Sequence, residues 1–354
     1  TKEMRTFFYY IICLWVISII YLFKVISLNG DAMVLGENII LKTIKMSIYP
    51  LIALIFYSFS YSFLRNQKNL EETLFIVFKY LQLFFACFLI VEIYYLQTEK
   101  SFLPFIHAVN EKYWRIRLLT LEESWTGTIL ILLIFFPIYL VNSLNKSIKE
   151  KRRIYFISCF IFISYAFVSE SKGFLFLLLI SVLPILLKSF FNNQKFKKLR
   201  GVLIPILIVG SLFIGVNFFD IVSDQLYSSG TFGTRFTSIL ASAKLFITNP
   251  FGVGWSGMVY YYPQEIQNVI DTGIVDRFIL LEIKTYTNTT LALSTKTEFL
   301  DNLVQGGIFF LIFYYLFFVK KYIKLIKIKE SIFLNIILLY MILAGVVYIT
   351  YNIK

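Results

Sequence analysis

The chain has 354 residues, of which 58% are hydrophobic and only 16% are charged, and its mean hydropathy is +0.75. Soluble globular proteins carry about 25% charged residues, so this composition excludes an ordinary soluble enzyme and predicts a multi-pass membrane protein. The net charge of +13 requires no nucleic-acid partner, because membrane proteins concentrate Lys and Arg in their cytoplasmic loops. One histidine, and three cysteines in apolar stretches, offer neither a metal cluster nor a disulfide framework.

Apolar stretches of about 20 residues, the length that crosses a bilayer, follow one another along the chain. We predict an all-α, polytopic transmembrane bundle that forms one integral membrane domain, 1–354, with about nine visible spans and ten or more in the full chain. The first stretch exceeds the apolar core of a signal peptide, about 7–15 residues, and no small-x-small cleavage site follows it, so it is interpreted as a retained span. The predicted spans are 7–27, 47–64, 73–96, 126–143, 154–169, 172–189, 201–219, 299–318 and 332–350.

The distribution of charge predicts the orientation of these spans. Lys and Arg gather in one alternating set of connections, above all at 146–153, 195–200 and 320–329, whereas most acidic residues fall in the other set. Because basic loops stay on the cytoplasmic side, we expect a cytoplasmic N-terminus in a bacterial inner membrane. The two long connections, 97–125 and 220–298, then lie outside, and any active site is expected on that outer face.

Several charged residues fall within or beside the spans. Lys24, Lys79 and Glu92 lie toward span ends, where side chains that extend to the interface explain them. Glu170 and Lys172 separate two spans with almost no loop between them, so both are expected at the outer interface. Charges at that depth are usually paired with one another or functional, and both interpretations stay open.

The second long loop contains the most distinctive pattern. Arg235 precedes apolar residues three or four positions apart, from Phe236 to Phe246, which predicts an amphipathic helix lying with its apolar face on the bilayer. An Asn-Pro-Phe-Gly-Val-Gly turn follows at 249–254, and the polar stretch from Thr297 leads into Gly306-Gly307 and another span. Taken alone, Arg235 is a candidate for contact with a lipid headgroup, and the glycines are turn residues.

The order of these features resembles the C-terminal signature of the O-antigen polymerase and ligase superfamily. In the first long loop, the stretch from Arg115 to Ser124 resembles the Arg…Gly-Leu…Glu-Pro-Ser pattern of repeat-unit polymerases, with Leu118 at the usual Gly and Glu123 at the usual Pro. Ser171-Lys172-Gly173 resembles a Ser-Arg-Gly turn of the superfamily, with lysine in place of arginine. The resemblance covers 115–127 and 169–318, about half of the chain.

This resemblance implies a metal-independent membrane glycosyltransferase that needs no cofactor. It would transfer a growing glycan from a polyprenyl-pyrophosphate carrier to the next lipid-linked repeat unit. Arginines suit the pyrophosphate because the guanidinium binds phosphate bidentately and stays charged. The implied pyrophosphate-binding residues are Arg235 and Arg115, with Lys172 or Arg117. Candidates for the base that activates the acceptor hydroxyl are Glu122, Glu170, Asp224 and Glu298, and the further candidates for substrate contact are Gly252, Gly254, Trp255 and Lys296.

Two other functions stay open. A ligase, which moves finished glycan to another acceptor, carries a histidine at the start of the last motif, where this chain has Lys296, so the polymerase is favoured. A transporter of lipid-linked oligosaccharide is expected to show paired internal repeats, and none is clear. No D-x-D or Walker motif indicates a nucleotide sugar or ATP. The expected partners are the lipid-linked donor and acceptor, membrane lipids, and a chain-length regulator and flippase of the same pathway.

Overall fold

The computed structural model describes residues 2–97, 118, 123–168, 172–192, 230–289, 293–295, 297–327 and 332–347. These residues are mostly helical, with connecting turns and one two-residue antiparallel ladder between β1 (Met33–Val34) and β2 (Glu37–Asn38). Contacts divide the chain into two compact units. The first unit comprises Thr1–Phe59, Phe191–Lys321 and Gly345–Lys354, and the second comprises Ser60–Phe190 and Tyr322–Ala344.

The predicted spans coincide with helices wherever the structure describes the chain, and 201–219 lies outside the described residues. Five of the described helices are long and apolar enough to cross a membrane. They are α1 (Lys2–Asn29), α2 (Ile39–Arg65), α3 (Leu70–Gln97), α4 (Glu123–Ser143) and the helical stretch Glu298–Lys324. The helices α5 (Ile148–Val168), α6 (Lys172–Asn192) and α13 (Ile332–Val347) are shorter or more charged, so the full count of nine spans stays a prediction.

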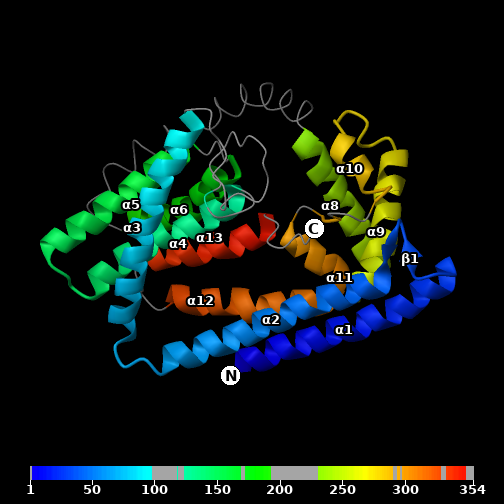
Figure 1. Cartoon of the computed structure of the whole chain (residues 1–354), viewed down its shortest axis with the longest axis horizontal. Helices are drawn as coiled ribbons and strands as arrows, with labels where there is room; N and C mark the ends of the chain where they lie inside the picture. Colours follow the sequence, from blue (N-terminus) through cyan, green and yellow to red (C-terminus); the bar gives the residue numbers. More distant parts are fainter. Residues whose placement is uncertain are drawn as a thin grey trace. The chain divides into compact units, whose positions relative to one another are not determined.

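In the first unit, helices of the second long loop pack against two long helices. The loop contains α8 (Gly230–Thr248), α9 (Gly254–Asp271) and the short α10 (Leu281–Thr285). Figure 1 shows these three gathered beside the end of α1 that leads into β1. Helix α9 contacts α1 and α8, and both α8 and α9 contact α11 (Glu298–Tyr314). After α11 the chain passes through a π-helical turn, η2 (Tyr315–Val319), into α12 (Lys320–Lys327).

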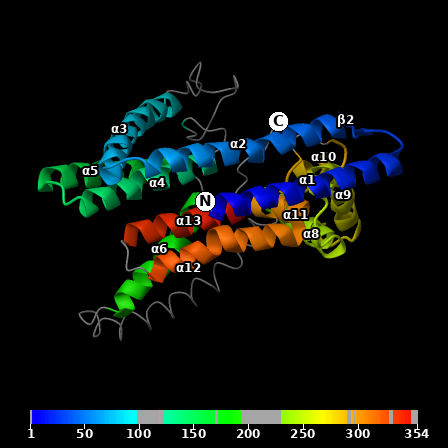
Figure 2. The ribbon, with the colours of Figure 1, turned by 90° about the horizontal axis from the view of Figure 1, so that it is seen from below.

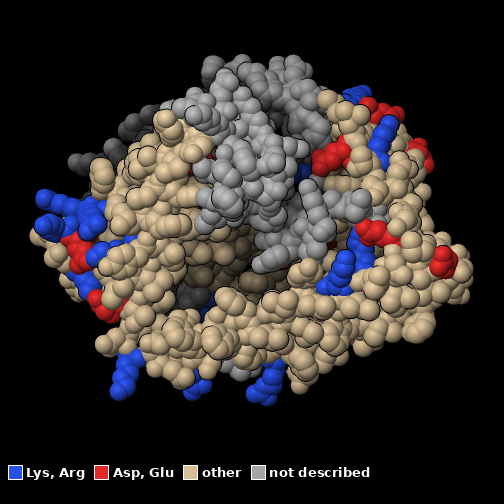
Figure 3. Space-filling view, viewed as in Figure 1, with Lys and Arg blue, Asp and Glu red and all other residues tan. Residues whose placement is uncertain are grey.

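In the second unit, α3, α4 and α5 pack on one another, as Figure 2 also shows. Their interface contains a buried polar group, because the Gln82 side chain donates to the Ser158 hydroxyl at 2.6 Å and to the Leu133 carbonyl at 3.1 Å. At the end of the unit where α4 turns into α5, basic and acidic side chains gather (Figure 3), and Lys79 forms an ion pair with Glu150 at 2.7 Å. Lys79 therefore has a protein partner, which the explanation by snorkelling did not anticipate.

Candidate functional site

The chain breaks the helical geometry of α11 at Gly307, whose φ of +52° and ψ of −135° lie outside the helical region. The turn after α8 fits against this break. The Ile308 N–H donates to the Pro250 carbonyl at 2.8 Å, and the Val253 N–H donates to the Val304 carbonyl at 2.9 Å. A Cβ at Gly307 would overlap the backbone of Pro250 and Gly252. Backbone groups released by the break thus gain partners from a segment about 55 residues earlier, as an apolar environment requires.

The same turn is held on its other side by α1. The Ser18 hydroxyl accepts a hydrogen bond from the Trp255 N–H at 3.0 Å, and the Ser256 hydroxyl donates to the Ser18 carbonyl at 3.0 Å. Gly254, with a φ of +64°, lies so close to Ser18 that a Cβ would come within 2.5 Å of its Cα. Buried Trp255 packs against Tyr10 and other side chains of α1 and α11. Gly252, Gly254 and Trp255 therefore serve the packing of the first unit, and their contact with substrate stays a prediction.

The residues after Arg235 belong to helix α8, whose most buried face is polar. Thr234, Thr237, Ser238 and Ser242 are all buried, together with Ala241 and Leu245. The predicted apolar face is divided instead: Ile239 and Ala243 are exposed, whereas Phe236, Leu240 and Phe246 are half-buried against neighbouring clusters. Small hydroxyl side chains let α8 approach α9 and α11 closely. The helix is thus part of the packed unit, in addition to any contact with lipid.

A buried polar cluster lies where α8, α9 and α11 meet. The hydroxyls of Ser238, Ser242 and Tyr262 are fully buried and lie near one another, but none of them makes a hydrogen bond of normal geometry with a described residue. Burial raises the pKa of Tyr262 far above its usual range, and the charge of nearby Asp301 acts in the same direction. The cluster therefore places neutral hydroxyls beside one carboxylate.

Asp301 organises the residues that precede α11. Its carboxylate accepts hydrogen bonds from the Thr295 N–H at 2.8 Å and from the Ser294 hydroxyl at 3.1 Å. Thr297 caps the helix, since its hydroxyl accepts from the Leu300 N–H at 3.1 Å. Sequence reasoning missed both Asp301 and Tyr262. The signal for Asp301 was available, because a threonine followed by acidic residues is typical of a helix N-terminus.

Arg235 lies on α8, the helix that carries Ser238 and Ser242. Positions three and seven residues apart share one face of a helix, so Arg235 shares a face with Ser238 and Ser242. Its side chain is half-buried and forms no ion pair with any residue that the structure describes. Glu298, in the first turn of α11, is also half-buried. It lies close enough to Asp301 and Tyr10 to interact with both electrostatically. The first unit thus carries Arg235 on α8 and two carboxylates, Glu298 and Asp301, in the first turn of α11, a helix that α8 contacts.

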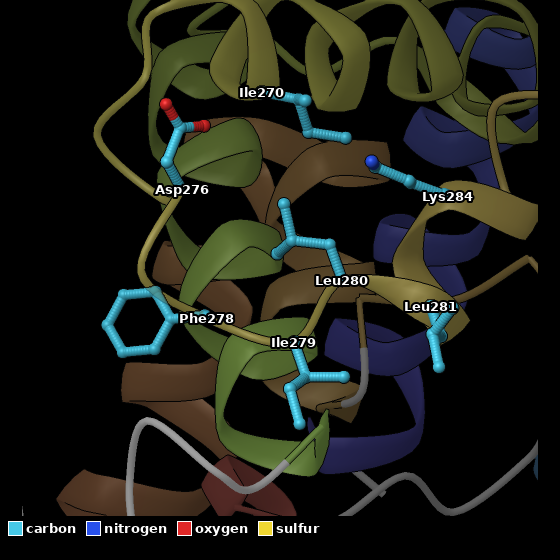
Figure 4. A pocket seen from close by; sticks show the side chains of 7 residues that line it. All are labelled: Ile270, Asp276, Phe278, Ile279, Leu280, Leu281 and Lys284. Atoms are coloured by element: carbon cyan, nitrogen blue, oxygen red, sulfur yellow. The ribbon is translucent and has the colours of Figure 1, made fainter.

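A recess of about 360 Å³ opens elsewhere in the same unit, between the end of α9 and α10. Figure 4 shows Asp276 and Lys284 on opposite sides of it, with Leu280 between them. The other lining side chains are apolar. Because its one cation is offset by a carboxylate, the recess is poorly suited to a pyrophosphate.

The remaining predicted site residues fall in the second unit or outside the described residues. Lys172 begins α6, and its backbone alone is described. In the first long loop the structure describes Leu118, whose φ of +47° is the left-handed conformation that favours glycine. That conformation agrees with the glycine that the polymerase pattern has at this position. Outside the described residues lie Arg115, Arg117, Glu122, Glu170, Asp224 and Lys296.

Comparison with known proteins gives one similarity. The chain is 30% identical over 142 residues to an uncharacterized 49.5 kDa protein in the cps region of Klebsiella pneumoniae. The matched stretch covers 38% of this chain and 33% of that protein, so the chain spans about a third of the relative's length. No model of a known protein family matches the chain, and no solved structure matches it.

Proposed function

We propose that this chain takes part in polysaccharide biosynthesis as a polymerase of lipid-linked oligosaccharide repeat units. The relative encoded in a cps region, a capsule gene region, supports a role in polysaccharide biosynthesis. The apolar helices are compatible with a membrane enzyme. The choice of a polymerase depends on the resemblance of the loop motifs and on Lys296, which stands where a ligase has histidine.

The observation that carries the proposal is the position of Arg235. A half-buried guanidinium with no carboxylate partner among the described residues is available to an anion of the substrate. At a partly dehydrated boundary, such a cation acts in a lower dielectric than bulk water and stabilises developing negative charge more strongly. In the proposed reaction, Arg235 holds the pyrophosphate that leaves when the glycan is transferred.

The acceptor hydroxyl must lose a proton as it attacks the donor sugar. Glu298 is the described candidate for this base, because it lies half-buried in the first turn of α11, a helix that contacts the one carrying Arg235. A carboxylate within hydrogen-bond reach of the acceptor hydroxyl can perform this proton transfer. The contributions of Arg115, Arg117 and Lys172 to pyrophosphate binding remain predictions from the sequence.

The test is complementation of a strain that lacks the gene, with the lipid-linked and surface glycans separated by size. Wild type should restore a ladder of polymer, whereas Arg235→Ala should leave a single repeat unit on the lipid. Arg277→Ala is the matched control, because Arg277 is an exposed arginine of the same loop. Each variant must reach the membrane in equal amount, as measured by immunoblot.

Other outcomes identify the alternatives. Full-length polymer that accumulates on the lipid carrier in the deletion strain indicates a ligase. A ladder that Arg235→Ala leaves unchanged, with normal protein level, contradicts the role of Arg235 and favours a transporter. Arg235→Lys separates charge from geometry, and we expect it to give shorter polymer than wild type, because an ammonium lacks the bidentate donors of a guanidinium.

A further inference from the structure

Lys24, near the end of α1, is held against two tyrosine rings of the first unit. Its ammonium lies 5.1 Å from the centroid of the Tyr21 ring and 5.4 Å from the centroid of the Tyr261 ring on α9. Both distances are within the range of a cation–π interaction. The two rings meet edge to face, with their centroids 5.9 Å apart. The ammonium therefore has a defined position, although the side chain of Lys24 is exposed.

The two rings are fixed by the packing of the unit. The Tyr21 hydroxyl donates to the side-chain oxygen of Asn249, in the turn after α8, at 2.8 Å. Both Tyr21 and Tyr261 pack against a buried cluster that includes side chains of α8 and α9. Because the groups that carry the cation are already ordered, a ligand that binds at Lys24 bears little of the cost of ordering them.

The charge of Lys24 is not neutralised by a carboxylate that the structure describes, whereas other lysines of the same unit are paired. Lys42 pairs with Glu37, and Lys244 pairs with Glu265 at 2.9 Å. A cation that is held in place without a counterion can bind an anion. At a membrane surface the anion available to an ammonium is a phosphate group, which accepts charge-assisted hydrogen bonds from lysine.

Lys24 and Arg235 lie toward opposite ends of α8. Arg235 is near the beginning of this helix, and Asn249, which binds Tyr21, follows its last residue. At a rise of about 1.5 Å per residue, Arg235 and Asn249 are about 20 Å apart along the helix. Figures 1 and 2 show α8 running across the direction of α1, so this separation lies across a candidate span and not along it. One pyrophosphate cannot contact both cations.

We propose that Lys24, placed by its two tyrosines, binds the pyrophosphate of the lipid-linked acceptor, whereas Arg235 binds that of the donor. This inference rests on the proposed function, because a polymerase of lipid-linked repeat units must hold two pyrophosphate carriers at once. The oligosaccharide of the acceptor lies between its own pyrophosphate and the hydroxyl that attacks the donor. A separation between the two anion sites is therefore expected.

The two cations differ as these roles require. In the transfer, the acceptor hydroxyl oxygen bonds to the anomeric carbon of the donor glycan, and its proton passes to the base. The bond from that carbon to the donor pyrophosphate breaks, and the electron pair leaves on the phosphate that Arg235 holds bidentately. The bonds of the acceptor pyrophosphate do not change. Lys24 thus contributes equally before and during the transfer, so its loss should weaken acceptor binding without slowing the transfer of bound acceptor.

The test is equilibrium binding of farnesyl pyrophosphate, a short polyprenyl pyrophosphate, to the purified protein in phosphatidylcholine nanodiscs. We expect two equivalents per chain for wild type. Lys24→Met keeps an apolar stem and removes the charge, and it should weaken one of the two sites about tenfold or more. Lys45→Met is the matched control, because Lys45 is an exposed lysine of the same unit. Two equivalents of unchanged affinity in Lys24→Met overturn the proposal.

Two substitutions of Tyr261 test whether the ring places the cation. Tyr261→Leu removes the aromatic face and should weaken the Lys24-dependent site about two- to fivefold, as loss of an exposed cation–π contact predicts. Tyr261→Phe keeps the ring and should bind like wild type. Equal weakening by both variants, with each protein folded and present in equal amount, contradicts placement of Lys24 by the ring.

Excess phosphatidylglycerol in the nanodiscs distinguishes a substrate pyrophosphate from a membrane headgroup. The Lys24-dependent equivalent should persist, because a pyrophosphate carries more negative charge than the single phosphodiester of this lipid. Selective loss of that equivalent assigns Lys24 to the bulk anionic lipid and overturns the acceptor site.

Glycan ladders from the complemented strains separate this inference from the proposed function. We expect Lys24→Met to shorten the ladder and Arg235→Ala to leave a single repeat unit. If Arg235→Ala keeps both equivalents and a full ladder while Lys24→Met loses one equivalent, the proposed role of Arg235 fails and the pyrophosphate site at Lys24 stands. If Arg235→Ala loses one equivalent and the ladder but Lys24→Met changes neither, the role of Lys24 alone is rejected.

Discussion

Irregular backbone is stabilised in two different ways in the two units. At Gly307, the backbone groups that the break in α11 leaves unpaired form hydrogen bonds with backbone groups of Pro250 and Val253. The close fit depends on the missing side chain of Gly307. At Leu118, the left-handed residue keeps its side chain, and a buried carboxylate from α3 binds its N–H. The first arrangement is sensitive to added volume, whereas the second is sensitive to the loss of the acceptor oxygens of Glu92. Substitutions can separate these two kinds of dependence.

The largest effect is expected for Gly307→Ala. The added methyl group would overlap the backbone of Gly252 and Pro250, and its φ of +52° with ψ of −135° is a region that residues with a Cβ rarely adopt. We expect a loss of about 4 kcal/mol or more in stability, seen as little folded protein in the membrane fraction. Gly345→Ala is the matched control, because nothing lies within 4 Å of a Cβ at that position. Equal levels of the two variants would show that the turn and the break do not fit as described.

A smaller effect is expected for Ser18→Ala, which leaves the packing volume but removes one acceptor. The buried Trp255 N–H loses its partner, and an unsatisfied buried donor costs about 1–3 kcal/mol. Thermal unfolding of the detergent-solubilised protein should show a lower midpoint. Ser47→Ala serves as the control, since that exposed hydroxyl donates only to the Ile44 carbonyl of its own helix. A midpoint like that of the control would mean that the contact between α1 and the turn adds no stability.

Asp301→Asn should change stability by about 1 kcal/mol, because an amide oxygen can replace one of the two acceptor atoms that bind Ser294 and Thr295. If Asp301 also keeps Glu298 in place for the proposed reaction, the glycan ladder should shorten more than this loss explains. Asp276→Asn, on an exposed carboxylate of the same unit, provides the comparison. A ladder of wild-type length from Asp301→Asn limits Asp301 to the local structure before α11.

The sequence predicts much of this fold, because a membrane span is recognisable from composition alone. Hydropathy located the helices from α1 to α6, and the spacing after Arg235 located α8. The sequence did not indicate that hydroxyl groups line the buried face of α8, because an amphipathic pattern predicts that the apolar face is the buried one. The geometry at Gly307 was also missed, although Gly306-Gly307 was noted, since its partners are about 55 residues away.

The candidate site was less predictable than the fold for the same reason. Glu92 was interpreted from its place near the end of a span, whereas the structure shows it buried and hydrogen-bonded to the Leu118 N–H. Residue type and spacing indicate which helix carries a side chain, but they do not indicate its tertiary contacts. Arg235 is the opposite case, because its position on α8 follows directly from helical periodicity.

The smallest effect on stability is expected for Tyr262→Phe, which sharpens the contrast with Ser18. The Tyr262 hydroxyl is fully buried and makes no hydrogen bond of normal geometry with the nearby Ser238 and Ser242 hydroxyls, so its removal relieves an unsatisfied polar group. We expect the free energy of unfolding to stay within about 0.5 kcal/mol of wild type or to rise, because an apolar replacement of the same shape is nearly neutral. The unfolding midpoint should then be unchanged or higher. Ser18→Ala, by contrast, creates an unsatisfied group where none existed.

If Tyr262→Phe instead lowers the midpoint as much as Ser18→Ala does, the hydroxyl has a partner, and bound water bridging Tyr262 and Asp301 is the first to test. If the midpoint is unchanged but the glycan ladder is lost, that hydroxyl acts in the reaction and joins Arg235 in the proposed site.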